Sequence, residues 1–141
     1  MDESIIGHHH HFVCLDCGEI EDFEVPEYFE KEIKNQNLSI LGWREVPVNS
    51  KVVGNIASQT QPKIKQVFIG KNNQKLSDVE FNTKLYVARK ITENTLYNID
   101  FSQKNYFYFS SLHNRTLIYK GLLVPEDIDK FFVDLSNPEL V

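Results

Sequence analysis

The sequence has few of the features that mark a secreted or membrane protein. It contains only two cysteines, Cys14 and Cys17, which lie too close together along the chain to cross-link a fold. No stretch approaches the roughly 18 consecutive apolar residues that a membrane-spanning helix needs. The first four residues carry two acids, whereas a signal peptide begins with basic residues. We therefore expect a cytoplasmic protein that does not enter the membrane.

The sequence also has no dense cluster of lysine and arginine, so it does not show the basic patch of a nucleic-acid-binding protein. Its net charge of −5 is unevenly spread. Residues 1–37 hold ten acids and two lysines, whereas residues 38–141 hold ten acids and thirteen basic residues. This shift near residue 37 fits a junction between two pieces of different origin, and a solvated acidic helix face would give the same count.

What the sequence does contain is the composition of one moderate globular core, with 41% hydrophobic and 12% aromatic residues in 141. Its strongest pattern is a pair of aromatic and β-branched runs, residues 106–109 and 116–119. They flank a short polar segment, residues 110–115, that carries turn signals. This pattern predicts a β-hairpin at the centre of a sheet.

The segment SLHNRTLIYKGLL at residues 111–123 resembles a segment of the glutaminase domain of the glutamate synthase large subunit, a class II glutamine amidotransferase. Further matching segments occur in family order: GWREVPV at 42–48, VGNIA at 53–57, PKIKQVFI at 62–69, KLYVARK at 84–90, and then Phe131, Phe132, Asp134 and Leu135. A series of motifs in order is more specific than one short pattern. The resemblance covers about the last hundred residues.

Local signals predict the other elements. Residues 38–44 and 63–70 favour strands, with Trp43 as a core residue. Residues 50–59 favour a weak helix broken by Gly54. Ser77 and Glu80 form a capping-box pattern that begins a helix over residues 77–93, and Arg89 and Lys90 suit its C-terminal end as solvated charges. Helices are also predicted over residues 26–35 and 125–132, each with a proline near its start.

We therefore predict an α+β fold, with a small, mostly antiparallel sheet of residues 38–44, 63–70, 106–109 and 116–119. The helices over residues 77–93 and 125–132 would cover one face. By the resemblance, this is an incomplete piece of an αββα amidotransferase fold. A piece that lacks one sheet leaves an apolar face uncovered, which predicts self-association or marginal stability.

The resemblance implies a reaction in which an N-terminal cysteine attacks the amide of glutamine, with its own α-amino group as the base. This chain begins with Met1-Asp2. The family's glutamine-binding arginine motif and oxyanion residues would lie beyond residue 141. We therefore expect no catalytic residue in this chain, and no flavin or iron–sulfur cluster. A Ser/His relay of His113 with Ser110 or Ser111 is disfavoured, because neighbours on one short turn seldom reach the required geometry.

The N-terminal segment GHHHHFVCLDCGEIEDF at residues 7–23 resembles the start of the metal-binding dimerisation domain of ferric uptake regulators. A CxxC knuckle closed by Gly18 can offer two thiolates to a tetrahedral zinc ion, and imidazole also suits zinc or ferrous iron. A remnant of a purification tag is the other reading of the histidine run. A run that leads directly into a strand-like Phe-Val-Cys favours the native reading.

We predict Cys14 and Cys17 as zinc ligands. Because side chains alternate along a strand, His10 would be the third ligand and His8 the fourth, with His9 or His11 as the less favoured contributors. The second CxxC of those regulators is absent from the sequence, so we expect a partly open, weaker zinc site. Without a winged-helix half, we do not expect binding to nucleic acid.

The predicted domain division is therefore a Cys/His segment of strand, knuckle, strand and helix over residues 1–37, and a partial glutaminase-like domain over residues 38–141. The junction would fall within residues 28–41. The predicted function is that of a non-catalytic fragment related to the glutaminase domain of glutamate synthase. The alternative is a zinc- or iron-binding module of metalloregulator origin, and an active amidotransferase is a third, less favoured, reading.

Overall fold

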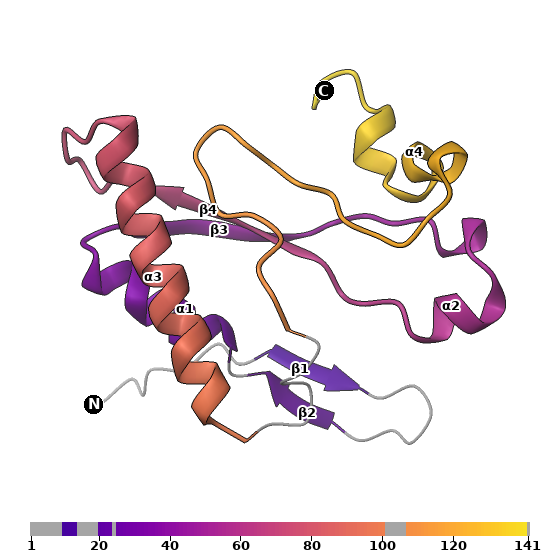
Figure 1. Ribbon diagram of the computed structural model, residues 1–141, viewed down its shortest axis with the longest axis horizontal. Coiled ribbons are helices and arrows are strands. Elements are labelled where there is room, and N and C mark those ends of the chain that lie inside the picture. Colours follow the sequence, from indigo (N-terminus) through magenta and orange to yellow (C-terminus); the bar gives the residue numbers. More distant parts are fainter. Residues whose placement is uncertain (1–9, 14–19, 24, 101–106, 141) are drawn as a thin grey trace, which may run out of the picture.

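A computed structural model describes residues 10–13, 20–23, 25–100 and 107–140, with side chains described from residue 27 onward. The described residues form two antiparallel two-stranded sheets and several helices, which makes an α+β fold (Figure 1). Strand β1 (His10–Val13) pairs with β2 (Ile20–Phe23), and β3 (Ser39–Glu45) pairs with β4 (Lys65–Gly70). The α+β class and the antiparallel pairing are as predicted.

Helix α1 (Val25–Asn35) leads into β3 through a left-handed turn at Asn37, where φ is 56°. Asparagine tolerates this conformation better than most residues do. The amides of Asn37 and Leu38 donate to the carbonyls of Lys34 and Ile33, at 2.8 and 3.0 Å, so the last carbonyls of the helix are satisfied. The same turn buries Leu38, which is 3% exposed. The chain therefore reverses onto the helix and begins the sheet.

Helix α3 (Asp78–Asn98) begins with the capping box predicted from Ser77 and Glu80, and both reciprocal hydrogen bonds are present. It extends five residues beyond the predicted end, because its buried face continues past Glu93. The residues on that face recur at helical spacing: Phe81, Leu85, Ala88, Thr92 and Leu96.

The first apolar cluster joins α1 and α3 to one face of the β3–β4 sheet. Its buried members are Phe29, Ile33, Leu38, Phe81, Leu85 and Ala88. Trp43 is partly buried, packs against this cluster and donates from Nε1 to Glu30 Oε1 at 2.7 Å, so it lies at the edge of the core in which the sequence placed it. Ile40, Val67 and Ile69 also pack there.

The second cluster lies around Val46, beyond the end of β3, with Phe131 and Phe132 as its other buried members. These two phenylalanines come from the short helix α4 (Ile128–Phe131) and the residue after it. A 3₁₀ turn (Pro125–Asp127) precedes α4 and another (Val133–Ser136) follows it. Helix α2 (Asn55–Gln59), separated at Gly54 from a 3₁₀ turn (Ser50–Val52), lies at the same end of the molecule (Figure 1).

The prediction that both helical segments cover one face of the sheet is wrong. Trp43 packs with α1 and α3, whereas the next residue, Arg44, binds Asp134 of the C-terminal segment. Because successive side chains of a strand point to opposite faces, α3 and the C-terminal segment contact opposite faces. Hydrophobic residues also remain exposed on the face of Arg44, notably Phe68 at 51% and Leu41 at 70%.

The predicted central hairpin is also wrong, because residues 107–124 contain neither strand nor helix. Side-chain contacts hold this segment instead of a ladder. The Phe109 ring packs on Phe29, with 5.1 Å between centroids. The Ile118 amide donates to Ser111 Oγ at 3.2 Å, and the Tyr119 hydroxyl donates to Asp134. The segment therefore crosses from the first cluster to the second as an irregular connection (Figure 1).

Candidate functional site

A polar network of Arg44, Gln66, Tyr119 and Asp134 ties four parts of the chain together: β3, β4, the connecting segment (residues 107–124) and the C-terminal segment (residues 125–140). The Arg44 guanidinium donates to both carboxylate oxygens of Asp134 and, through Nε, to Gln66 Oε1 at 2.8 Å. The Tyr119 hydroxyl donates to Asp134 Oδ2 at 2.7 Å and accepts from Gln66 Nε2 at 3.4 Å. We call these four residues the Arg44 network.

The electrostatics of the network follow from these contacts. The Arg44 hydrogen bonds hold the pKa of the Asp134 carboxyl below its ordinary value, although the side chain is only 5% exposed and its burial acts in the other direction. The Asp134 carboxylate in turn raises the pKa of Arg44. Burial, followed by the hydrogen bond to Asp134, raises the pKa of Tyr119. All of these shifts preserve one charge state, with Asp134 ionised and Tyr119 neutral, which suits a structural tie.

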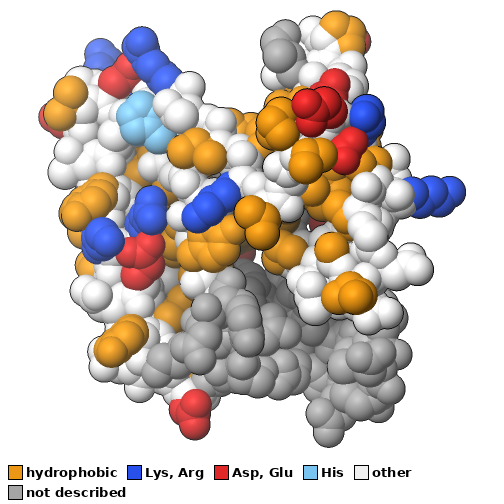
Figure 2. All heavy atoms as spheres, turned by 45° about the vertical axis from the view of Figure 1, so that its right-hand side comes forward, with side chains coloured by type: hydrophobic (Ala, Val, Ile, Leu, Met, Phe, Trp, Pro, Cys, Tyr) orange, Lys and Arg blue, Asp and Glu red, His pale blue; other side chains and the backbone are white. Residues whose placement is uncertain are grey.

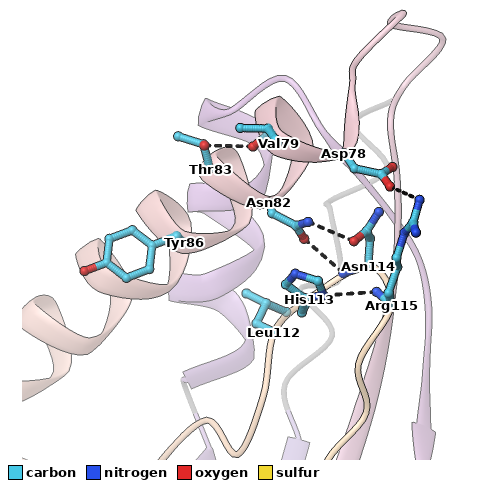
Figure 3. A pocket seen from close by; sticks show the side chains of 9 residues that line it. All are labelled: Asp78, Val79, Asn82, Thr83, Tyr86, Leu112, His113, Asn114 and Arg115. Carbon is cyan, nitrogen blue, oxygen red and sulfur yellow. Dashed lines mark hydrogen bonds and ion pairs between the residues drawn. The ribbon is translucent and has the colours of Figure 1, made fainter.

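A second polar site lies where α3 faces residues 112–115, in a depression of about 620 Å³ that opens to solvent (Figure 3). Its lining residues are Asp78, Val79, Asn82, Thr83, Tyr86, Leu112, His113, Asn114 and Arg115. We call it the α3 depression. The Asn82 carboxamide donates to Asn114 Oδ1 at 2.8 Å and accepts from the Asn114 amide at 3.0 Å, while Arg115 forms an ion pair with Asp78.

His113 in this depression is not part of a Ser/His relay. Its Nδ1 atom accepts from the Arg115 amide at 3.2 Å, and Ser111 Oγ is engaged by the Ile118 amide. Both side chains therefore stabilise turns in the connecting segment. Arg89 and Lys90, predicted as solvated helix charges, form ion pairs with Glu93 at 2.7 and 2.9 Å. Arg89 also donates to the Phe109 carbonyl at 3.2 Å.

The predicted metal ligands fall largely outside the described residues. Cys14, Cys17, His8 and His9 are not described, and His10 and His11 are described only as backbone positions of β1. Within the described part of the chain, no group of three or more histidine, cysteine or acidic side chains could hold a metal ion. Val13 and Ile20, the described residues on either side of positions 14–19, pair with each other.

The Arg44 network was not among the sites predicted from the sequence. One signal for it is Asp134, an acid within the run Phe131-Phe132-Val133-Asp134-Leu135, because an ionised residue among buried aromatics requires a partner. The identity of that partner has no local signal, since Arg44 lies 90 residues earlier in the chain.

Comparisons with known proteins all point to one family. The sequence model of the family of class II glutamine amidotransferases matches residues 7–141. The "Glutamate synthase [NADPH] large chain" of Bacillus subtilis is 38% identical over 125 residues, which are 87% of this chain and 8% of that protein. "Ferredoxin-dependent glutamate synthase 2, chloroplastic" of Arabidopsis thaliana is 40% identical over 114 residues, covering 80% of this chain and 6% of that protein. "Glutamate synthase [NADH]" of Saccharomyces cerevisiae is 34% identical over 113 residues, covering 77% and 5%.

The chain thus spans less than a tenth of the length of these relatives. The family match begins at residue 7 and so includes the Cys/His segment. The comparisons give no support to a metalloregulator origin for that segment. They bear out the resemblance read from residues 42–135.

Proposed function

The chain belongs to the class II glutamine amidotransferases, and on that premise we propose that it is a part of a glutamate synthase that supports the glutaminase domain without hydrolysing glutamine itself. The relatives compared above are all named as glutamate synthases, which supports glutamine-dependent glutamate formation as the activity of the whole protein. The observation that carries the supporting role is the Arg44 network, which joins β3, β4, the connecting segment and the C-terminal segment into one unit.

The chemistry of the described polar groups agrees with this role. Asp134 is held ionised by Arg44 and capped by Tyr119, so its charge is balanced within the fold. Ser111 and His113 both accept hydrogen bonds from main-chain amides of their own segment. These groups hold the connecting segment and the C-terminal segment in place, as expected for a framework.

The direct test is to incubate the purified chain with L-glutamine and to measure glutamate release. We expect the same rate as in buffer. A faster release of glutamate, lost on substitution of Cys14→Ser or Cys17→Ser, would contradict the non-catalytic role. Cysteine thiolates are the groups in this sequence best suited to act as nucleophiles.

A chimera tests the link to glutamate synthase. We would replace the matched stretch of the Bacillus subtilis large chain with the corresponding residues of this chain. Retained glutamine-dependent glutamate formation would support the proposal. Loss of that activity in a chimera that is folded and binds its cofactors would contradict it.

A second candidate function is zinc binding by Cys14 and Cys17 with His8 and His10, or less favourably His9 or His11. The observation that favours it is the β1–β2 register, in which Val13 and Ile20 pair with each other and so bring the two ends of the sequence that carries the CxxC together. Two thiolates spaced as in a CxxC suit a tetrahedral zinc site.

Zinc stoichiometry on untagged protein tests this function, with Cys14→Ser and Cys17→Ser measured beside it. We expect bound zinc in the parent protein, less in each variant, and weaker binding at lower pH as the ligands take up protons. An absence of zinc from the parent, or equal zinc in the double variant, would disprove the site.

A further inference from the structure

We propose that the α3 depression is a binding site for a free α-amino acid with an apolar side chain. In this arrangement Arg115 binds the α-carboxylate and Asp78 binds the α-ammonium group. The inference goes beyond the proposed function and does not depend on it, because it concerns the side chains of α3 and residues 112–115 alone.

The first argument is the pair of opposite charges at the rim of the depression. Arg115 and Asp78 form an ion pair whose side chains remain 76% and 42% exposed. An exposed pair of this kind contributes little to stability, so its partners can be exchanged at small cost. The guanidinium has five donors and can bind a second carboxylate, and the Asp78 carboxylate can accept from an ammonium group.

The two charges together select the class of ligand. A simple anion at Arg115 would lie beside the negative charge of Asp78, and a simple cation at Asp78 would lie beside the guanidinium. A zwitterion places an opposite charge against each side chain, so it avoids both repulsions. Both charges come from described side chains that point toward each other across the rim (Figure 3).

The second argument is that the rim is already held in place. Two hydrogen bonds join Asn82 of α3 to Asn114, at 2.8 and 3.0 Å. The Arg115 amide donates to His113 Nδ1, which fixes the backbone that carries the guanidinium. A site whose backbone is ordered before the ligand arrives loses less conformational entropy on binding.

The third argument is the apolar wall beside the charges. Leu112 packs against the first apolar cluster, while Val79 and Tyr86 lie along α3 and are 76% and 59% exposed. The depression is shallow and opens widely to solvent, so a bound molecule would keep much of its surface exposed. An amino acid with its charged groups at Asp78 and Arg115 could lay an aliphatic or aromatic side chain along this wall. Because the depression is open, we expect a Kd on the order of 1 mM.

Titration of the isotope-labelled protein with L-leucine and L-phenylalanine, followed by amide NMR, tests the proposal. We expect saturable shifts at the side-chain amides of Asn82 and Asn114 and at the Arg115 amide. N-acetyl-leucine lacks the ammonium group, leucinamide lacks the carboxylate, and glycine lacks the side chain. Each should bind more weakly than leucine by about fivefold or more.

Two variants and a matched control decide the role of the charges. Asp78→Asn and Arg115→Gln should each weaken leucine binding by about fivefold. Asp127→Asn and Lys130→Gln alter another ion pair, 3.0 Å long and outside the depression, and should leave binding unchanged. An absence of saturable shifts with leucine and phenylalanine would overturn the proposal, as would equal binding of N-acetyl-leucine or unchanged binding in Asp78→Asn and Arg115→Gln.

Discussion

At the scale of single residues, Asp134 stands out because it is the one charged side chain that is buried among the described residues. It is 4% exposed and accepts from Arg44 and Tyr119. An ionised carboxylate at such a position is stable only while its partners are present. Its effect on the fold therefore depends on a residue of β3 and a residue of the connecting segment.

Replacing Asp134 with asparagine should lower the free energy of unfolding by about 2 kcal/mol, because Arg44 then lacks a balancing charge. The Arg44 side chain is 32% exposed, so water can solvate the unpaired guanidinium. The loss of stability should therefore be smaller than for a fully buried ion pair. Urea unfolding measures the change. Asp129→Asn, at an exposed acid in the same segment, is the control and should stay within about 0.5 kcal/mol of the parent. Equal effects of the two substitutions would contradict the role of the network.

Asp134 should also make the free energy of unfolding depend on pH in the acidic range. The pKa of Asp134 is lowered in the folded protein by the Arg44 hydrogen bonds, relative to about 3.9 in an unfolded chain. Its stabilising contribution is therefore complete above the unfolded pKa and is lost as the pH falls through the folded pKa. Unfolding measured from pH 6 down to about pH 3 should show a steeper loss for the parent than for Asp134→Asn. Parallel curves would show that the Asp134 charge does not stabilise the fold.

At the scale of elements, helix α3 illustrates how local chemistry fixes the start of a helix while packing fixes its end. Ser77 Oγ accepts from the Glu80 amide at 3.2 Å, and the Glu80 carboxylate accepts from the Ser77 amide at 2.8 Å. These bonds to Ser77 lower the pKa of Glu80. The end of the helix depends instead on Thr92 and Leu96, which are buried against the rest of the protein.

Substitution of Ser77 by alanine should lower the free energy of unfolding by about 1 kcal/mol, because the Glu80 amide then loses its capping acceptor. Ser77→Thr keeps an acceptor at the same position and should lose only a few tenths of a kcal/mol. Thermal or urea unfolding of the two variants provides the comparison. If threonine is as damaging as alanine, the hydroxyl cap is not the cause.

At the scale of the whole molecule, the two apolar clusters leave a hydrophobic surface between and around them. Figure 2 shows hydrophobic side chains spread across the face toward the viewer. The exposed large residues of the described chain include Leu41, Phe68, Leu117, Ile118, Leu122 and Val124. Within that part of the chain, no helix is long and apolar enough to cross a bilayer. The chain spans less than a tenth of the length of its relatives.

We therefore predict that the isolated chain self-associates or unfolds at low denaturant concentration. Sedimentation velocity at several protein concentrations measures the first outcome. Phe68→Gln and Leu41→Gln should reduce association, because both residues lie exposed on the face of the sheet opposite the first cluster. Tyr97→Gln, at a residue 75% exposed near the end of α3, is the control. A monomer with a sharp two-state melt would contradict this prediction.

The sequence by itself determined the elements whose signals are local. The Ser77–Glu80 box and the break at Gly54 each act within a few residues of the backbone they shape, so they could be read from the sequence. Pro125 likewise marked the start of the helix predicted over residues 125–132, which the structure has as a 3₁₀ turn followed by the shorter helix α4. Strands β3 and β4 were also predictable, since their apolar residues face the α1–α3 cluster. The family was readable from its series of motifs.

Only the tertiary structure decided how residues 107–124 lie and what they contact. Their aromatic and β-branched composition favours strands, but a strand needs a neighbouring strand with which to form backbone hydrogen bonds. Here the side chains of Asn82, Asp134 and Ser111 accept hydrogen bonds from the segment instead. The Arg44–Asp134 pair likewise joins residues that lie 90 positions apart in the sequence. The contacts across the α3 depression join residues that lie 32 and 37 positions apart. No local propensity encodes such distances, because these contacts form only when the packing of both clusters brings the groups together.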